Sequence, residues 1–171
     1  MTTLWTAFDS PIGTLTLMSN GDALTSLFMT GQRHAPTISA IPNAQRDDAW
    51  FVECATELRS YFAGELKTFT IEVAPSGTTF QQRVWSELVR IPYGATRTYG
   101  ELAVALGDPN ATRAVGTANG RNPIGIIIPC HRVIGRDGSL TGYAGGLDRK
   151  RWLLQHEGLP TQCDFGALLR A

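Results

Sequence analysis

The sequence contains no apolar run near the length of about 18 residues that a membrane-spanning helix needs. Its first residues also lack the basic segment followed by an apolar stretch that marks a secretory signal. These two absences argue against a membrane protein and against export. We therefore expect a cytoplasmic protein that has no membrane partner.

Cysteine is scarce, with three in 171 residues. The cysteines are Cys54, Cys130 and Cys163. An odd number at wide spacing, with no C-x-x-C pair, implies no disulfide framework and no zinc site. The three histidines add no metal-ligand spacing. We expect neither a bound metal nor a cofactor.

Net charge is zero overall, yet the two halves differ in sign. Residues 1–76 carry four basic and eight acidic side chains, whereas residues 77–171 carry eleven basic and seven acidic ones. An excess of positive charge in the second half favours an anionic partner there, such as a nucleic acid. Simple solubility is the alternative explanation.

The first quarter of the chain has a β pattern. Residues Thr14–Met18 alternate polar and apolar side chains, and Asn20-Gly21 is a strong hairpin signal before a return strand at Leu24–Met29. Residues 30–46 have few apolar side chains and several prolines and glycines, so we predict a loop.

A helix follows, capped by Asp47 or Asp48 and ending near Ala63. Cys54 lies on its apolar face, which indicates a core residue. Phe69–Val73 alternates as a further strand. The Pro/Gly break that follows sets the predicted domain boundary, with an N-terminal α/β domain at 1–76 and a second domain at 77–171.

The second half is mostly helical. Thr79-x-x-Gln82 has the form of a capping box at the start of a helix that ends near Ile91. This helix presents an apolar face, with Phe80, Val84, Leu88 and Ile91 on one side and Trp85 and Val89 beside them.

A helix-turn-helix pattern comes next. Thr98-x-x-Glu101 caps a short helix to Leu106, a turn with Gly107 follows, and Asp108-Pro109 opens a second helix that ends at Asn119-Gly120. Helical spacing places Ala111, Ala114, Val115 and Ala118 toward the core. The opposite face carries Asn110, Arg113, Gly116, Thr117 and Gly120. A face of small residues with one long cation favours close approach to a duplex; a solvated face or a tight helix crossing is the alternative.

The stretch that organises the chain surrounds Cys130. Residues Gly125–Ile128 form an apolar run that favours a buried extended segment, and Pro129 interrupts it. The charged neighbours of Cys130 favour a lowered pKa and a reactive thiolate, although a free cysteine also serves as a small core residue.

Downstream, Thr141–Gly146 is a glycine-rich loop around Tyr143, which either admits a flat ring or acts as a flexible connector. We predict that Asp148 caps a helix to Glu157. Residues after Pro160 have the pattern of a loosely packed tail, with Cys163 exposed there.

Several motifs together resemble one family. Pro129–Val133 resembles the active-site signature of the O6-alkylguanine-DNA alkyltransferases. Further motifs fall in the family's order at Thr112–Gly116, Asn122-Pro123, Tyr143–Gly146, Trp152–Leu154 and His156–Gly158. The strong resemblance covers residues 79–158, while Asp9–Gly13 and Tyr61–Gly64 are similar to bacterial members in outline.

The resemblance implies an α+β protein with a small ribonuclease-H-like N-terminal α/β domain and a mainly helical C-terminal domain that contains the helix-turn-helix. It implies direct-reversal repair of double-stranded alkylated DNA, bound through the minor groove. O6-methylguanine would be flipped out and its alkyl group transferred irreversibly to the protein's own cysteine, so each molecule reacts once. The protein would act as a monomer; O4-methylthymine as a second substrate and cooperativity on DNA stay open. Members with a structural zinc hold it through paired cysteines and histidines that this chain lacks.

By the same resemblance, Cys130 is the nucleophile, His131 reaches it through a water, and Glu157 holds His131. An exposed helix end is the alternative explanation of Glu157. Asn122 would brace the loop before the cysteine, and Tyr99 would donate a hydrogen bond to guanine N3 and so assist the leaving group.

The substrate pocket implied by the resemblance involves the carbonyls of Cys130 and Val133, with Tyr143 as a wall and Lys150 near the tyrosine. At Ala144 some members have a serine, so only the backbone N–H remains here. Arg113 would fill the space of the extruded base. The remaining implied DNA contacts are Gln81, Ala111, Thr112, Ala114 and Gly116.

Two competing functions remain at this point. A helix-turn-helix regulator or damage-sensing module would bind DNA without changing it, and a Cys-His hydrolase would turn over an ester or peptide. Alkyltransferase-like proteins without activity lack the cysteine, so the presence of Cys130 favours a working enzyme.

Overall fold

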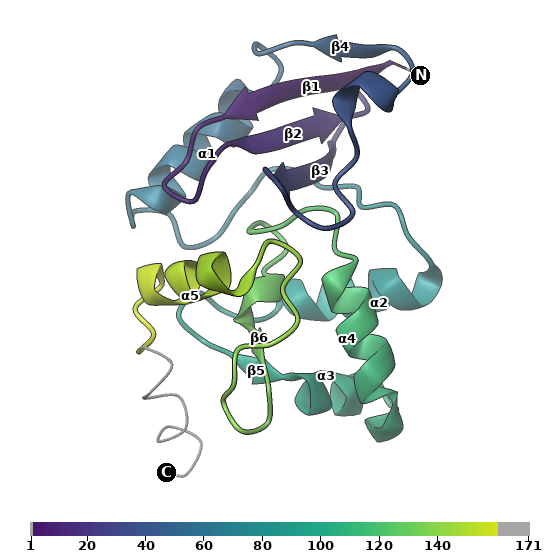
Figure 1. The fold of residues 1–171 in the computed structure, drawn as a ribbon, viewed down its shortest axis with the longest axis vertical. Helices are drawn as coiled ribbons and strands as arrows, with labels where there is room; N and C mark the ends of the chain where they lie inside the picture. The colour runs from purple at the N-terminus through teal and green to yellow at the C-terminus, as the bar shows by residue number, and fades with distance from the viewer. Residues whose placement is uncertain (1, 161–171) are drawn as a thin grey trace. The chain divides into compact units, whose positions relative to one another are not determined.

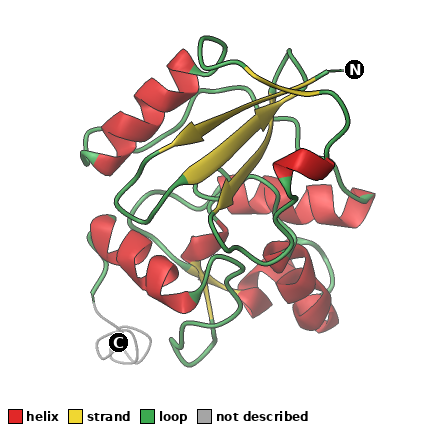
Figure 2. Cartoon of the chain, turned by 45° about the horizontal axis from the view of Figure 1, so that its top comes forward, coloured by secondary structure: helices red, strands yellow, loops and turns green. Residues whose placement is uncertain are grey.

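The computed structural model describes residues 2–160, so the predicted tail and Cys163 lie outside the described residues. The chain divides into two compact units (Figures 1 and 2). The first unit comprises Met1–Ser76 together with Pro123–Gly125, and the second comprises Gly77–Asn122 and Ile126–Ala171. We predicted a single boundary after residue 76; the short segment 123–125 of the second half belongs instead to the first unit.

The first unit contains a four-stranded sheet in the order β3-β2-β1-β4. Its strands are β1 (Thr3–Phe8), β2 (Leu15–Ser19), β3 (Leu24–Met29) and β4 (Ala44–Arg46). β2 and β3 form the predicted antiparallel hairpin, with Leu17 opposite Leu27. Both leucines are fully buried, because alternate side chains of each strand point to the same face of the sheet.

Helix α1 (Val52–Phe62) belongs to the same unit. Its buried side chains are Cys54, Leu58 and Tyr61, and the ring of Phe62 stacks on that of Phe8 at 6.4 Å between centroids. The prediction that Cys54 is a core residue is therefore confirmed. Burial raises the pKa of this thiol to about 12, which keeps it protonated and unreactive at neutral pH.

Three local predictions in this unit are wrong. The helix starts later than predicted, because the Asp47 carboxylate accepts from the N–H groups of Ala49 and Trp50 and so caps the preceding turn. Strand β4 lies within the predicted loop, paired in parallel with β1. The predicted strand Phe69–Val73 is reduced to a bridge between Val73 and Leu24.

The lost strand has a physical cause in α1. The carboxylate of Glu57 accepts hydrogen bonds from the backbone N–H groups of Thr70 and Ile71, at distances of 2.9 to 3.3 Å. Those donors are the ones that a strand ladder would use. The helix side chain therefore replaces sheet pairing for this segment.

Within its described residues, the second unit contains four α-helices and a two-stranded parallel sheet of β5 with β6. The elements are α2 (Thr79–Val89), β5 (Arg97–Thr98), α3 (Tyr99–Ala105), α4 (Thr112–Gly120), β6 (Val133–Ile134) and α5 (Leu147–His156). Short 3-10 turns lie at Ile38–Ala40 in the first unit and at Pro109–Ala111 and Cys130–Arg132 in the second. Over residues 2–160, no helix combines the length and the apolar character that crossing a membrane requires.

Helices α3 and α4 form the predicted helix-turn-helix (Figure 1). Thr98 and Glu101 close the predicted capping box, and Asp108 accepts from the N–H of Asn110 at the next turn. Val115 is buried as predicted, but Ala114 is exposed. Ala114 lies one residue before Val115, which is about 100° around the helix, and so falls on the solvent side of the stripe that Val115 and Ala118 form.

The start of α2 is shifted by one residue from the prediction. The N-cap is Thr78, whose hydroxyl accepts from the N–H of Gln81, while the side chain of Gln81 accepts from the N–H of Thr78. Val89, which we assigned to the apolar face, is 57% exposed. The predicted DNA contact Gln81 therefore has its side-chain oxygen engaged in a capping box.

The assignment of Thr78, and not Thr79, as the N-cap of α2 can be tested by substituting each residue in turn. Replacing Thr78 by Ala should lower the free energy of unfolding by about 1 kcal/mol, because a helix N–H loses its acceptor. Replacing Thr79 by Ala should change it by less than about 0.5 kcal/mol, as expected for a surface position. Urea unfolding of the full chain measures both, and equal losses would contradict the assignment of Thr78 as the cap.

Candidate active site

The backbone before Cys130 is a buried turn, so our prediction of an extended run at Gly125–Ile128 is wrong. Ile126 is fully buried and has φ of 70°, a left-handed conformation that is strained for a β-branched residue. Pro129 then has the dihedral angles of an inverse γ-turn, and the N–H of Cys130 donates to the carbonyl of Ile128 at 2.8 Å. These turns place the cysteine at the start of the 3-10 turn Cys130–Arg132.

Cys130 is 6% exposed. Burial raises its pKa, and this effect outweighs a hydrogen bond from Asn122, the charge of Lys150 and the nearby backbone N–H groups, all of which lower it. Our prediction of a lowered pKa is therefore wrong for the unliganded protein. A protonated thiol is a poor nucleophile, so the site needs a base before Cys130 can react.

His131 is fully buried beside the cysteine. Its Nε2 lies 2.8 Å from Oε1 of Glu157, while Nδ1 has no hydrogen-bond partner among the described residues. Burial lowers the pKa of the imidazole more than Glu157 raises it, so the ring is neutral at neutral pH. If Glu157 is ionised, Nε2 carries the proton and Nδ1 is left as a proton acceptor.

Glu157 directly follows α5 and is 4% exposed, which rules out the exposed helix end that we considered. Burial raises the pKa of its carboxyl, but hydrogen bonds and charges from His131 and Arg132 outweigh burial and hold the pKa far below its usual value. Arg132 binds both carboxylate oxygens, with Nε 2.8 Å from Oε2 and Nη2 3.0 Å from Oε1. Its Nη1 donates to the carbonyl of Ile91 at 2.6 Å.

Two buried asparagines hold the turn around the cysteine. Nδ2 of Asn122 donates to the carbonyl of Ile128 at 2.8 Å, as a brace for the loop would. Nδ2 of Asn119 lies 3.4 Å from the carbonyl of Cys130. Helix α4 ends at Gly120, as predicted, and Asn119 is its buried next-to-last residue.

Tyr99 and Lys150 converge on the glycine-rich loop. The carbonyl of Thr141 accepts from the Tyr99 hydroxyl at 2.9 Å and from Lys150 Nζ at 2.8 Å, and Nζ also donates to the carbonyl of Val133. Burial lowers the pKa of Lys150 to about 8, with the charge of Cys130 opposing that shift. Gly142 has φ of 66°, and an added Cβ would lie 2.8 Å from the Tyr99 hydroxyl, so the loop needs glycine here.

Two family models match the chain, one over each of its two halves. Residues 3–75 match the ribonuclease-like domain of 6-O-methylguanine DNA methyltransferase, and residues 79–159 match the DNA binding domain. The chain belongs to the 6-O-methylguanine DNA methyltransferase family. Its mixed fold, with an N-terminal sheet and a helical C-terminal half, is the fold of that family.

Relatives cover nearly the whole chain. A methylated-DNA–protein-cysteine methyltransferase of Mycobacterium tuberculosis is 54% identical over 149 residues, which is 87% of this chain and 88% of that protein. The protein of the same name from Methanosarcina acetivorans is 51% identical over 152 residues, covering 88% and 96%. The crystal structure of Mycobacterium tuberculosis OGT in complex with DNA aligns with a TM-score of 0.84 and 49% identity over 95% of this chain and 98% of that one.

Within the methyltransferase, the structure brings most of the predicted site residues into one unit. Cys130, His131 and Glu157 adjoin one another, and Tyr99 and Lys150 meet at the neighbouring loop. The other predicted pocket residues are the buried Asn122 and Val133 and the partly buried Tyr143 and Ala144. The described residues contain no group of three or more His, Cys, Asp or Glu side chains that could hold a metal ion.

The predicted DNA-contact residues lie mainly at the start of α4. Thr112, Arg113 and Ala114 are exposed, and the Arg113 guanidinium has no partner among the described residues. Gly116 faces the ring of Tyr99, where an added Cβ would lie 3.8 Å from the nearest ring atom. Ala111 is partly buried, and Gln81 belongs instead to the start of α2.

Sequence reasoning did not identify Arg132 and Asn119 as members of the site. Arg132 lies inside the signature, but nothing in the sequence shows that its side chain turns inward to a carboxylate 25 residues away. The prediction that Asp148 caps α5 is also wrong, because the helix begins at Leu147 after Gly146. Gly146 has φ of 93°, which ends the loop and lets Asp148 take a place in the first turn of the helix.

The role of Arg132 in holding Glu157 can be measured through stability. Replacing Arg132 by Met should lower the free energy of unfolding by about 3 kcal/mol or more, because the buried carboxylate loses its paired cation. Replacing Arg90 by Met is the matched control, since its ion pair with Glu87 leaves the arginine side chain 73% exposed. The control should cost less than about 1 kcal/mol. Similar losses in urea unfolding would show that Arg132 does not hold the carboxylate.

Proposed function

We propose that this methyltransferase repairs alkylated DNA by moving the alkyl group from guanine O6 to Sγ of Cys130, once per protein molecule. The observation that carries this proposal is the buried Cys130–His131–Glu157 cluster, in which one imidazole nitrogen is held by a carboxylate and the other is open. Such a cluster supplies a nucleophile and a base in a site that excludes bulk water.

In this arrangement the acceptor for the proton of the Cys130 thiol is His131. The ionised Glu157 holds the proton of His131 at Nε2, so Nδ1 accepts the proton of Cys130 through a water. The resulting imidazolium lies against Glu157, which stabilises its charge. Arg132 keeps the carboxylate ionised, so the proton remains on the histidine.

The chemistry is an in-line displacement. The sulfur forms a bond to the alkyl carbon, the bond from that carbon to O6 breaks, and the electron pair leaves with the guanine, which then takes up a proton. Tyr99 is the donor to guanine N3 in this proposal. Burial raises the pKa of the Tyr99 phenol, which keeps it protonated and able to donate. Its hydroxyl donates to Thr141 in the unliganded protein, while Lys150 holds the same carbonyl independently.

In this proposal the guanine base is bound by groups at Cys130–Val133 and in the glycine-rich loop Thr141–Gly146. The carbonyls of Cys130 and Val133 accept from the exocyclic amine of guanine, with Tyr143 as a wall. The backbone N–H of Ala144 replaces the serine hydroxyl found in some members. The Cys130 carbonyl already accepts from the N–H of Val133 and from Nδ2 of Asn119, and the Val133 carbonyl accepts from Lys150 Nζ. The amine of guanine therefore shares these acceptors with, or replaces, one of the protein donors.

DNA binding is assigned to the helix-turn-helix, in the minor groove. The exposed Arg113 enters the base stack in place of the extruded nucleotide, and the small side chains of Ala111, Thr112, Ala114 and Gly116 let the helix approach the duplex. Gln81, at the start of α2, is a further proposed DNA contact: its side-chain oxygen closes a capping box, which leaves the amide N–H groups to donate to the DNA backbone. One monomer acts on one lesion in this proposal, which leaves cooperativity on DNA to measurement.

The nucleophile is tested by intact mass after mixing the protein with a duplex that holds one O6-methylguanine. The wild type should gain one methyl group on the peptide that contains Cys130 and leave unmodified guanine in the DNA. Cys130→Ser should gain none while it still binds the duplex, and Cys54→Ala should react like the wild type. Methyl transfer by Cys130→Ser would overturn the assignment; tight binding by the wild type with no mass change would favour a damage-sensing protein.

Base extrusion is tested by comparing two substrates. Arg113→Ala should slow repair of the duplex by about ten- to a hundredfold, because nothing then offsets an unstacking cost of a few kcal/mol. It should slow the reaction with the free base O6-benzylguanine far less, since that substrate is never stacked. Single-turnover rates measure both, and equal losses on the two substrates would remove the proposed role.

A further inference from the structure

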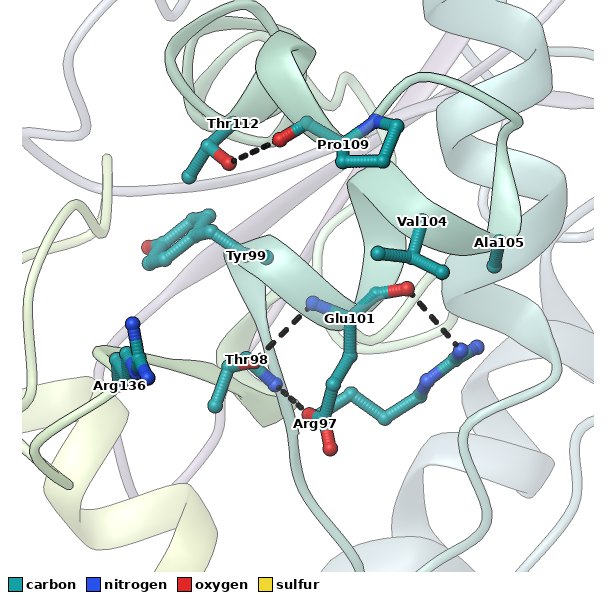
Figure 3. Close-up of a pocket in the computed structure, with 10 residues that line it drawn as sticks. Arg97, Thr98, Tyr99, Glu101, Val104, Ala105, Pro109, Thr112 and Arg136 are labelled. Atoms are coloured by element: carbon teal, nitrogen blue, oxygen red, sulfur yellow. Dashed lines mark hydrogen bonds between the residues drawn. The ribbon is translucent and has the colours of Figure 1, made fainter.

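A cavity of about 950 Å³ opens on the second unit, beside the helix-turn-helix (Figure 3). It runs along the first turn of α3 and past Pro109 and Thr112 at the start of the second helix, with Arg136 on the other side. Cys130 does not line it, so it is separate from the site of alkyl transfer. Of the residues already assigned to the reaction or to DNA contact, only Tyr99 and Thr112 line this cavity.

Two of the charged side chains in the cavity are already engaged. The Arg97 guanidinium lies 3.4 Å from Oε2 of Glu87 and donates to the carbonyl of Glu101 (Figure 3). The Glu101 carboxylate accepts from the N–H of Thr98 at 2.6 Å and so completes a helix cap. The charge of Arg97 is therefore paired with Glu87, whereas the Glu101 carboxylate keeps its negative charge because the N–H of Thr98 is a neutral donor.

Arg136 differs from these two residues. It is exposed, it follows β6, and its guanidinium has no hydrogen-bond or ion-pair partner among residues 2–160. The adjacent Asp137 makes no ion pair with it; that carboxylate accepts from the N–H and hydroxyl of Ser139. Of the two arginines that line the cavity, Arg136 is therefore the one whose guanidinium is free to pair with an anionic ligand.

Tyr99 connects this cavity to the proposed base pocket. Its ring lines the cavity, while its hydroxyl donates to Thr141 in the loop that borders Cys130. A guanine held at the hydroxyl of Tyr99 must have its sugar and phosphate at the mouth of the pocket, outside the ring. Val104, Ala105 and Pro109 add apolar surface to the cavity, which suits the packing of a deoxyribose.

We propose that Arg136 binds a backbone phosphate of the DNA strand that carries the alkylated guanine, next to the extruded nucleotide. This inference rests on the proposed function and adds a positioning contact that the sequence motifs did not assign. Arg113 acts within the base stack, whereas Arg136 holds the extruded strand from the outside. The contact fixes the register of the strand as the base enters its pocket.

The test combines a charge substitution with neutral phosphates. Arg136→Ala should reduce affinity for a lesion-containing duplex by about three- to tenfold at low salt. The slope of log affinity against log salt concentration should fall by about one, as expected for the loss of one phosphate contact. Arg136→Lys should retain most of the slope because it retains the charge. Arg151→Ala is the matched control, since it removes an arginine of the same unit that pairs with Asp148.

A second measurement locates the phosphate. Methylphosphonate linkages placed one at a time around the lesion should weaken wild-type binding at one position that no longer matters in Arg136→Ala. Equal effects of every linkage on both proteins, an unchanged salt slope, or an equal loss in Arg151→Ala would each overturn the contact. Failure of the wild type to transfer a methyl group from either duplex or free base would instead overturn the proposed function, so the two failures are distinguishable.

Discussion

The buried carboxylate of Glu157 is the group on which the rest of the site depends. Arg132 occupies both of its oxygens and also reaches the carbonyl of Ile91, just beyond α2. The N–H of Gly94 lies 3.3 Å from the same carboxylate. One ionised group thus ties the end of α5 to the segment after α2 and to the cysteine turn. Removing either charge would leave the other buried without compensation, which is far more costly than losing a surface pair.

The buried, ionised Glu157 also bears on the protonation of His131 and Cys130. Glu157 orients the proton of His131, and burial keeps both the imidazole neutral and the thiol protonated. A protein that reacts once has reason to keep its thiol out of solution, because a stray oxidant or electrophile would consume it permanently. In the proposed mechanism the thiol loses its proton to His131 inside this buried site, away from bulk solvent.

Several positive charges of the second half are buried or paired with carboxylates of the protein itself. Arg132 and Lys150 are buried, and Arg97 and Arg151 pair with carboxylates. Among the described residues of this unit, only a few guanidinium groups lack a partner, and Arg113 and Arg136 both lie where the proposed DNA path runs. A net charge counted from the sequence does not show which cations are available to bind phosphates, so the position of each arginine matters more than the total.

Much of the architecture follows from the sequence alone. The hairpin, the core position of Cys54, the helix-turn-helix and the family signature around Cys130 depend on neighbours in sequence, and local patterns record them. The apolar run before Pro129 was predicted as extended because periodicity cannot separate a buried strand from a buried turn. The strand at Phe69–Val73 failed because a carboxylate from α1 takes its N–H donors.

The sequence by itself determined which residues are proposed to carry the chemistry, since the signature places a thiol, an imidazole and a distant glutamate in a recognisable order. Only the tertiary structure decided how those groups ionise. Burial raises the pKa of Cys130 despite its charged neighbours, and the ion pair that keeps Glu157 ionised joins positions 25 residues apart. The tertiary structure also separated the neutralised Arg97 from the unpartnered Arg136. Protonation and pairing depend on what surrounds a side chain in space, and most of those surroundings come from distant parts of the chain.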